Sequence, residues 1–435
     1  MVQMFRCNKR TCLYIFYFAL IAVLLYVILK ENGSSVLVDN NRKRWTRNET
    51  KYKHEYQRFH ERQRHLRRRC LKVLKTNNHT ACEDQQEMKN NLKYVKKKNV
   101  LYCSIEQTGN TFWRRIPHVE GGWGGTSNPT RIEISKAYDG KGGYRNMQNK
   151  KWAEVENLFK RTELVLFVRN PFSRLFSGWL DKFYSPNVFY WNKTGKDILE
   201  SQRHDLDNDS IRCASDVSFV EFVNYTVHEM LSNKCIDGHF SSMYSHCLPC
   251  HLPFRYIGKY ETIKEDIAAL IELLDLTDAV RFNDFETDAV FDAIMDSSSW
   301  VYKEKEKVVA CGVSFSCALF REWSRLQSRG LISKKMDFPY KTKEEINTLK
   351  QEQFERDLAM AHFESSPQDL KNNRHEALLQ ALKTLPEAVI KKLLLAFETD
   401  FDLFDYDRRP LSFAESGSTE ISGFTYFSSC PQQFR

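Results

Sequence analysis

The chain has 435 residues, enough for one large domain with appendages or for two domains. Its hydrophobic content of 42%, with 30 Phe and 19 Tyr, can fill a substantial core and excludes a chain too polar to fold. The formal net charge of +9 suits a nucleic acid, an anionic lipid or an acidic polysaccharide equally well. That excess is uneven, because residues 42–75 are intensely basic and the remainder is nearer balance.

The N-terminus predicts a membrane anchor. Residues 11–29 carry no charge, and a helix of that length covers about 28 Å, enough for the core of a bilayer. A cleaved signal peptide is the alternative, but the apolar run is longer than a usual signal core and no small-x-small site follows it. We therefore expect residues 1–10 to be a cytoplasmic tail and residues 11–29 an uncleaved signal-anchor. Basic residues on both sides of the run make the positive-inside rule only suggestive here.

Two features favour a lumenal location for the rest of the chain. Glycosylation sequons begin at Asn32, Asn48, Asn78, Asn192, Asn208 and Asn224. Ten cysteines lie beyond the anchor: Cys70, Cys82, Cys103, Cys213, Cys235, Cys247, Cys250, Cys311, Cys317 and Cys430. In an oxidising compartment an even set of cysteines predicts disulfides, although the sequence does not give their pairing. The sequence thus predicts a single-pass type II protein with a lumenal body.

Residues 30–97 are predicted to form a basic stem. Residues 45–74 are dense in Arg, Lys, His and Glu and contain no Pro or Gly, so they would form a solvated helix or have no fixed structure. A plain spacer is the favoured interpretation. Attraction to an acidic glycan or an acidic protein comes second, and nucleic acid is disfavoured as a partner behind a membrane anchor.

The globular part is predicted to begin at residue 98 with a short apolar strand, residues 99–103. A loop containing a glycine follows at residues 104–111, and residues 112–116 can open a helix. A strand, a small polar loop and a helix N-terminus together can hold a phosphate, because backbone N–H groups and the helix dipole converge there. No Gly-Lys-Ser/Thr sequence is present, so this is not the loop of the P-loop NTPases.

A second stretch predicts a buried strand followed by a helix. Residues 164–168 are an unbroken apolar run, typical of a parallel strand that is buried on both faces. Asn170 and Pro171 suit the N-cap and the first position of the helix that follows. Arg169 then stands at the carboxyl end of the strand, where α/β sheets bind ligands, and Ser177 lies two turns into the helix. This pair could hold a phosphate, although an ordinary turn with a solvated arginine is the alternative.

Cys247 and Cys250 form a CxxC pair, which His246 and His251 flank. We favour structural disulfides for these cysteines. A zinc site and redox exchange are the alternatives, and the absence of a second CxxC weakens the zinc interpretation.

Four blocks together resemble the Golgi carbohydrate sulfotransferases of the chondroitin 4-O, dermatan 4-O and HNK-1 group. They are residues 102–115, similar to that family's 5′-phosphosulfate loop; Phe167 to Ser177 with Asp181, Lys182 and Phe183, similar to its 3′-phosphate motif; Cys247 to Thr262; and residues 400–406. The resemblance covers roughly residues 98–407, except for residues 285–385, a divergent segment with helical patterns. Residues 411–435 are expected to be a loosely ordered tail.

This resemblance implies an α/β sulfotransferase fold, P-loop-like with a central parallel sheet, over residues 98–410. It also implies PAPS, 3′-phosphoadenylyl sulfate, as the sulfate donor, and no metal. The donor contacts that it implies are Arg169, Asn170 and Ser177 for the 3′-phosphate, the loop Gln107, Thr108, Gly109, Asn110 and Thr111 for the 5′-phosphosulfate, and Lys259. Phe112 and Trp113 would pack near the adenine or, as we favour, behind the loop.

Catalysis is expected to involve His239 and Gln107. His239 matches the His of the family's HW pair, with Phe240 in place of Trp, and is our candidate for the base that takes the hydroxyl proton. A structural or acceptor-binding histidine is the alternative. The resembled family carries Lys at the position of Gln107. That Lys is expected to stabilise the bridging oxygen as the sulfate leaves. Losing one such contact typically slows a reaction by about 10²–10³-fold. Arg114 could compensate.

The sequence therefore predicts a Golgi membrane sulfotransferase that acts on a glycosaminoglycan or a glycoprotein glycan, with a chondroitin- or dermatan-like acceptor favoured. A homodimer is compatible with this prediction, and nucleic acid is not an expected partner. The alternative is a catalytically weak or inactive relative that binds PAPS or glycan as a regulatory subunit. A lumenal kinase is disfavoured, because neither a Gly-Lys-Ser/Thr loop nor matching metal-binding carboxylates occur.

Overall fold

The computed structural model describes residues 52–75, 85–140, 142–205, 212–409 and 423–435. The chain divides into two units, Met1–Thr50 and Lys51–Arg435, and all the described residues belong to the second unit. The predicted tail and anchor, residues 1–29, lie outside the described residues. Within the ranges described, no helix is long and apolar enough to cross a membrane.

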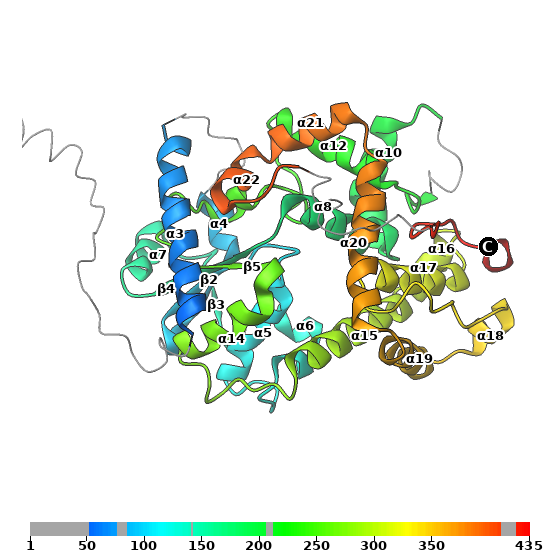
Figure 1. Ribbon diagram of the computed structural model, residues 1–435, viewed down its shortest axis with the longest axis horizontal. Coiled ribbons are helices and arrows are strands. Elements are labelled where there is room, and N and C mark those ends of the chain that lie inside the picture. Colours follow the sequence, from blue (N-terminus) through cyan, green and yellow to red (C-terminus); the bar gives the residue numbers. More distant parts are fainter. Residues whose placement is uncertain (1–51, 76–84, 141, 206–211, 410–422) are drawn as a thin grey trace, which may run out of the picture. The chain divides into compact units, whose positions relative to one another are not determined.

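A mixed sheet lies at the centre of the described residues, with the strand order β3-β1-β2-β4-β5 (Figure 1). Its strands are β1 (Leu92–Val95), β2 (Val100–Cys103), β3 (Arg145–Asn146), β4 (Glu163–Val168) and β5 (Tyr256–Lys259). The prediction of a parallel sheet holds for β2, β4 and β5. It fails for β1, which pairs antiparallel with β2 and β3. The reason is the connection from β1 to β2, which is a 3₁₀ turn at Lys96–Lys98 and far too short for a parallel crossover.

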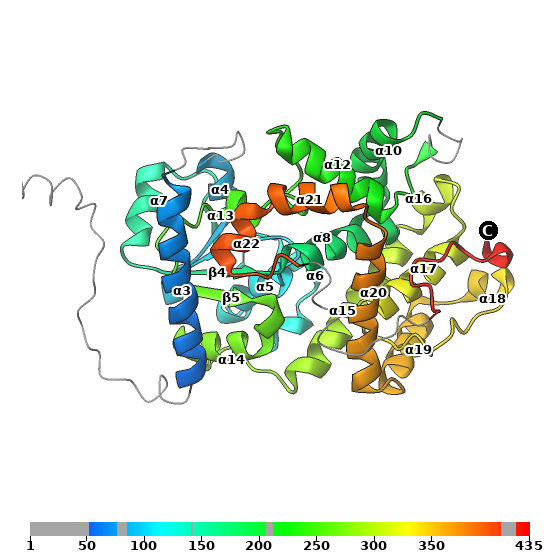
Figure 2. The same ribbon diagram turned by 45° about the horizontal axis from the view of Figure 1, so that its top comes forward.

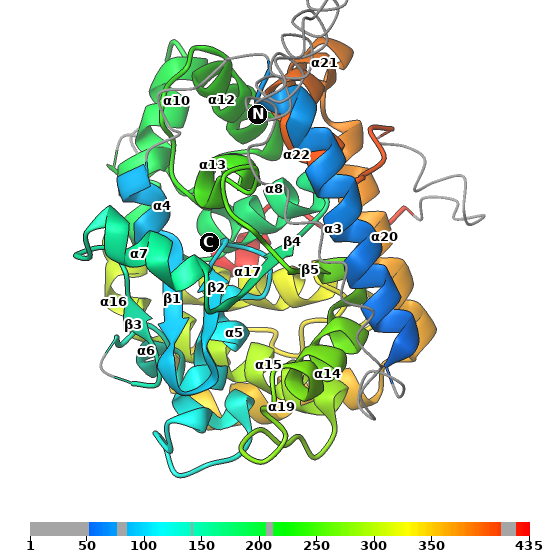
Figure 3. The ribbon, with the colours of Figure 1, turned by 90° about the vertical axis from the view of Figure 1, so that its left-hand side faces the viewer.

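Helices cover both faces of the parallel strands, as the apolar run in β4 predicts (Figure 3). On one face, Leu164, Leu166 and Val168 join a buried cluster with side chains of α7 (Trp152–Phe159), α13 (Met243–Cys247) and α22 (Glu398–Phe404). On the other face, Val165 and Phe167 pack with side chains of α5 (Asn110–Glu120) and α14 (Ile263–Leu273). The carboxyl ends of β2 and β4 are therefore held rigidly from both sides.

The folded body begins earlier than predicted. Helix α3 (Lys53–Val73) lies against β5, with Phe59 and Leu66 buried in its inward face. Arg58 and Arg62 both bind the buried Asp266 carboxylate at 2.6 Å. The prediction of a stem over residues 30–97 is thus corrected for α3 and β1. The basic composition of this region hid an amphipathic helix whose inward arginines are paired.

Residues 285–396 are mostly helical, as the helical patterns in 285–385 predict, and Figure 2 shows these helices gathered beside the sheet. These helices are α15 (Phe285–Lys303), α16 (Lys305–Ala310), α17 (Phe315–Ser328), α18 (Lys343–Thr348), α19 (Gln351–Phe363), α20 (Pro367–Lys383) and α21 (Glu387–Ala396). The expected loose tail is corrected for residues 423–435. There Tyr426 and Phe434 are buried, and the Tyr426 hydroxyl donates to Glu376 at 3.0 Å.

Other helices among residues 85–231 are α4 (Gln85–Asn91), α6 (Ile134–Ala137), α8 (Pro171–Trp179), α9 (Val188–Tyr190), α10 (Lys196–Gln202) and α12 (Phe219–Leu231). Two π-helical turns, η3 (Leu180–Tyr184) and η4 (Trp191–Gly195), follow α8 and α9. Such turns are rare and occur frequently at functional sites.

Disulfides join distant parts of the chain. The pairs are Cys70–Cys250, Cys103–Cys247, Cys213–Cys311 and Cys317–Cys430. In the CxxC pair, Cys250 bonds to Cys70 of helix α3 and Cys247 bonds to Cys103 of strand β2. The two cysteines do not bond to each other, and their role in structural disulfides is confirmed. Among the residues that the structure describes, no group of three or more His, Cys, Asp or Glu side chains could hold a metal ion.

Candidate active site

The loop between β2 and α5 has the backbone geometry of an anion site. Gly109 caps α5 in the left-handed conformation, with φ 87°, and a Cβ at this position would lie 2.8 Å from Ile263. Gln107 is also left-handed, with φ 66°. The buried Thr108 hydroxyl donates to the Ile105 carbonyl at 2.8 Å and fixes the turn. The first N–H groups of α5 have no partner within the helix, so they and the helix dipole favour an anion here.

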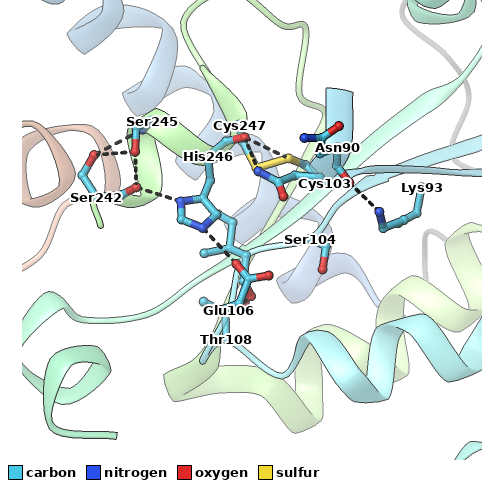
Figure 4. Close-up of a disulfide and its surroundings, with 12 residues drawn as sticks. Asn90, Lys93, Cys103, Ser104, Glu106, Thr108, Ser242, Ser245, His246 and Cys247 are labelled. Atoms are coloured by element: carbon cyan, nitrogen blue, oxygen red, sulfur yellow. Dashed lines mark hydrogen bonds and ion pairs between the residues drawn. A yellow bond between two sulfur atoms is a disulfide. The ribbon is translucent and has the colours of Figure 1, made fainter. Parts of the chain in front are cut away.

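A buried polar cluster supports this loop from below (Figure 4). The Glu106 carboxylate lies 2.9 Å from Nε2 of His246. His246 directly precedes Cys247, which forms a disulfide with Cys103, the last residue of β2. Burial alone would raise the pKa of Glu106, but the hydrogen bond from His246 lowers it to about 2. Arg174 of α8 donates from Nε to the Glu106 carbonyl at 2.9 Å. The Glu106 side chain is therefore paired with His246.

Arg169 follows β4 directly, and its guanidinium reaches across to the loop. Nη1 donates to the Gln107 carbonyl at 3.1 Å, and Nε donates to the Ser173 hydroxyl at 3.2 Å. The guanidinium also lies over the Tyr260 ring, 4.2 Å from its centroid. Burial lowers the pKa of Arg169 from its usual value, but an arginine stays charged in proteins.

Asn170 positions Arg169 and starts α8, as the sequence predicts. Its side chain accepts from the backbone N–H groups of Phe172 and Ser173, the N-cap arrangement. Its own N–H donates to Glu261 at 2.8 Å, and the other oxygen of Glu261 accepts from the Tyr406 hydroxyl at 2.9 Å. Asn170 is thus a positioning residue, whose bonds are made within the protein.

Ser177 and Gln107 are brought together, although 70 residues separate them in the chain. The Ser177 hydroxyl donates to Gln107 Oε1 at 2.8 Å. Gln107 Nε2 in turn donates to Asp181 in η3 at 3.1 Å. Arg169, Ser177 and Gln107 therefore lie together near the carboxyl ends of β2 and β4.

Asp181 is the centre of a charged group below Gln107. Lys182 lies 2.9 Å from Asp181 Oδ2, and Arg325 of α17 lies 2.9 Å from Asp181 Oδ1. Burial would raise the pKa of Asp181, but these two cations hold it well below its usual range. The sequence reasoning missed Arg325, which lies in the segment that the resemblance did not cover.

His239 lies beside α8, and its ring nitrogen Nδ1 has two polar neighbours. Nδ1 is 2.7 Å from Asp237 and 3.0 Å from the Tyr190 hydroxyl. A Cβ built on Gly178, next to Ser177, would lie 3.4 Å from the His239 carbonyl oxygen, so this histidine borders α8. The His239 side chain is 25% exposed, which leaves the ring accessible to a substrate.

Four predicted donor contacts have other partners: Lys259, Trp113, Phe112 and Thr111. The Lys259 ammonium binds the Asp405 carbonyl at 3.1 Å and lies over the Tyr406 ring, and burial lowers its pKa to about 8. Trp113 packs between Tyr102 and Phe167 in the core. The remaining contacts are those of Phe112, which packs on Phe282 and Phe285, and of Thr111, whose hydroxyl lies 3.0 Å from that of Tyr138.

Two further polar residues lie near the loop and the Arg169 turn, Asp400 of the fourth sequence block and Arg114 of the first. Asp400 accepts from the N–H groups of Met243 and Tyr244 at 2.7 and 2.9 Å and so fixes the start of α13. The Met243 sulfur in turn accepts from the N–H of Arg169 at 3.4 Å. Arg114, considered as a substitute for the missing loop lysine, donates to Ser104 and lies over the Tyr138 ring.

A loop that opens a helix, two parallel strands and an arginine at a strand end are features of α/β proteins, which bind ligands at the carboxyl ends of their strands. The chain belongs to the sulfotransferase family, whose model matches residues 90–313, just over half of the chain. The helices from α17 onward lie beyond this match.

Individual relatives are carbohydrate sulfotransferases. Mouse (Mus musculus) carbohydrate sulfotransferase 11 is 29% identical over 185 residues, 42% of this chain and 52% of that protein. Mouse carbohydrate sulfotransferase 8 is 28% identical over 228 residues, 52% and 53% of the two chains. Human (Homo sapiens) carbohydrate sulfotransferase 9 is 27% identical over 199 residues, 44% and 43%. The chain thus spans about half the length of the curated relatives it matches. No solved structure matches it significantly.

Proposed function

We propose that this chain transfers the sulfuryl group of PAPS to a hydroxyl of a carbohydrate. The observation that carries the proposal is the convergence of Arg169 and Ser177 on Gln107, at 3.1 and 2.8 Å. PAPS carries a 3′-phosphate and a 5′-phosphosulfate, so its binding needs two neighbouring anion sites. The N-terminus of α5 offers one, and Arg169 with Ser177 offers the other.

The donor contacts follow from this geometry. The backbone of Thr108, Gly109 and Asn110 would hold the 5′-phosphosulfate, while Arg169 and Ser177 would hold the 3′-phosphate. Asn170, Lys259, Phe112 and Trp113 support the site and are not proposed as donor contacts, because the bonds and packing that they show are made with the protein itself.

His239 is proposed as the base. In the transfer, the acceptor oxygen forms a bond to sulfur while the bond from sulfur to the bridging oxygen breaks, and adenosine 3′,5′-bisphosphate leaves with the electron pair. The hydroxyl proton passes to Nε2 of His239. Asp237, at 2.7 Å from Nδ1, fixes the tautomer and stabilises the imidazolium that forms.

The acceptor and the location extend the same proposal. The names of the relatives support a carbohydrate acceptor, and a glycosaminoglycan or glycoprotein glycan, chondroitin- or dermatan-like, is the form we favour. The disulfides suit an oxidising compartment such as the Golgi lumen, where a type II anchor at residues 11–29 would hold the body. A homodimer remains part of this proposal.

A second function is favoured by one observation, the engaged side chain of Gln107. Its amide is uncharged and bonds at both ends within the protein, so this residue does not itself stabilise a leaving group. The chain would then bind PAPS or glycan as a regulatory subunit.

One experiment separates the two functions. The full chain is incubated with labelled PAPS and a panel of chondroitin, dermatan and N-glycan acceptors, beside Arg169→Ala, Gln107→Lys and the exposed control Arg131→Ala. We expect transfer by the wild type and by Arg131→Ala. Removing charged hydrogen bonds worth about 1.5–3 kcal/mol should weaken the affinity of Arg169→Ala for adenosine 3′,5′-bisphosphate by about 10–100-fold.

Thermal unfolding of each variant shows whether a lost activity reflects lost folding. Transfer that first occurs in Gln107→Lys, with nucleotide binding already present in the wild type, would establish the binding protein instead. A wild type that binds neither PAPS nor adenosine 3′,5′-bisphosphate would overturn both functions.

A further inference from the structure

The side chain of Gln107 stands where the resemblance implies a lysine, and another cation lies in its environment. Gln107 bridges α8 and η3 by accepting from Ser177 and donating to Asp181 Oδ2 at 3.1 Å. Lys182 Nζ lies 2.9 Å from the same oxygen of Asp181. The loop amide and the Lys182 ammonium are thus separated by one carboxylate oxygen, so a cation is present directly beside position 107.

The other cations near this point are committed elsewhere. Arg325 binds Glu322 at 2.7 Å and Ser297 at 3.0 Å besides Asp181, and its side chain is 10% exposed. Arg174 donates to the carbonyls of Glu106, Ser241 and Gly238 and is fully buried. Arg114 donates to Ser104, behind the loop. Each of these groups holds the protein together and has its direction fixed.

Lys182 differs in two ways. Its ammonium has three donors, and within the described residues Asp181 is the carboxylate that engages it. It also lies over the face of the Tyr190 ring, 4.9 Å from the centroid, in a cation–π arrangement, and its side chain is 15% exposed. The π-helical turn η3 places Asp181 and Lys182 together on this side of the helix.

The same tyrosine connects Lys182 with the proposed base. The Tyr190 hydroxyl lies 3.0 Å from His239 Nδ1, while the Tyr190 ring carries the Lys182 ammonium. Lys182 is therefore connected to the donor loop through Asp181 and to His239 through Tyr190. In an in-line transfer the migrating group occupies the space between the donor loop and the base.

We propose that Lys182 contacts the phosphosulfate of the donor and stabilises the charge that develops on the oxygen released by sulfur. This inference rests on the proposed function and explains how the site would work with glutamine in the loop. Lys182 forms and breaks no covalent bond: the electron pair of the breaking S–O bond stays on the bridging oxygen, and the ammonium donates a hydrogen bond to it.

The test uses Lys182→Gln, Lys182→Arg and the double variant Gln107→Lys/Lys182→Gln in the full chain. Asp181 keeps its pair with Arg325 in all three, so folding should survive, and thermal unfolding checks it. Lys335→Gln is the matched control, because Lys335 also pairs with a carboxylate, Asp369 at 3.0 Å, but is 66% exposed. We measure kcat for sulfate transfer and the affinities for PAPS and adenosine 3′,5′-bisphosphate.

Lys182→Gln should lower kcat by about 10²–10³-fold, and the double variant should recover at least about tenfold of it, because the charge returns from the loop side. Lys182→Arg should lie between, and Lys335→Gln should match the wild type. A kcat of Lys182→Gln within about threefold of the wild type would overturn the proposal while leaving the sulfotransferase function intact.

Nucleotide affinity decides the matter if the wild type transfers nothing. A charged hydrogen bond to the sulfate should then make the affinity for PAPS about tenfold higher than that for adenosine 3′,5′-bisphosphate. Lys182→Gln should abolish that preference. An unchanged preference would overturn the role of Lys182. A wild type that binds neither nucleotide overturns the proposed function, and this inference with it.

Discussion

The sheet side and the helical side of the described residues organise their polar groups differently. On the sheet side, polar groups gather at the strand ends, where Gln107, Arg169 and Glu106 bond to backbone and to each other. On the helical side, α15 to α19 contribute to a separate apolar cluster, and Arg325 of α17 extends to Asp181. The groups proposed for the chemistry therefore lie on the sheet side, while Arg325 of the helical side supplies a counter-charge to Asp181.

This contrast predicts that His239, on the sheet side, affects turnover far more than stability. Replacing a general base typically costs about 10²–10⁴-fold, so His239→Gln should lower kcat within that range. Its side chain is partly exposed, and Phe240 rather than His239 fills the core, so the thermal midpoint should stay close to that of the wild type. Kinetics with saturating PAPS, together with the affinity for adenosine 3′,5′-bisphosphate, measure the effect.

The exposed His228 of α12 provides the control, since His228→Gln makes the same change away from the site. Asp237→Asn should also slow turnover, because it removes the carboxylate that orients Nδ1. If His239→Gln turned over like His228→Gln, the base would have to be sought elsewhere on the sheet side.

A second prediction concerns the connection between the two sides. Arg325→Met leaves the buried Glu322 without its closest cation and removes one cation from Asp181. Breaking a buried pair from one end typically costs about 3–5 kcal/mol, so the free energy of unfolding should fall by roughly that amount in a urea titration. Nucleotide affinity should fall much less, since Gln107 and Lys182 still hold Asp181.

Arg321→Met is the matched control on the same helix. Arg321 donates to the Phe183 carbonyl at 3.0 Å and packs over the Tyr184 and Trp191 rings, so its loss should cost about 1–2 kcal/mol. Equal losses in the two variants would mean that packing of α17, and not the pairing with Asp181 and Glu322, connects the sides.

How far the sequence predicts this molecule depends on the distance in the chain between partners. Arg169, Asn170 and Ser177 were predictable because a buried strand, a cap and a helix follow one another within a few residues. The role of Arg325 was not, since 144 residues separate it from Asp181. Neither was the pairing of Cys250 with Cys70, at a separation of 180 residues. The inward face of α3 was not predictable either, because Arg58 and Arg62 pair with Asp266, 208 and 204 residues away in the chain.

A smaller effect is expected from pH, through Asp400 on the sheet side. Burial raises the pKa of Asp400 from 3.8 to about 6, although the Met243 and Tyr244 N–H groups oppose the rise. Because the folded-state pKa is the higher one, the folded protein keeps a proton here that the unfolded chain loses. The stability from this proton is complete below about pH 4 and is lost as the pH rises through about 6.

At 1.36 kcal/mol per pKa unit, the loss is about 3 kcal/mol between these two values. Asp400→Asn should lack this component of the slope when unfolding free energies are measured by urea titration from pH 4 to 7. The variant should be less stable overall, because an amide offers the two N–H groups of α13 one oxygen in place of two. Asp402→Asn, two residues along α22, should keep the wild-type slope. If Asp400→Asn kept the wild-type slope, the pH dependence of the unfolding free energy would come from other groups and not from Asp400.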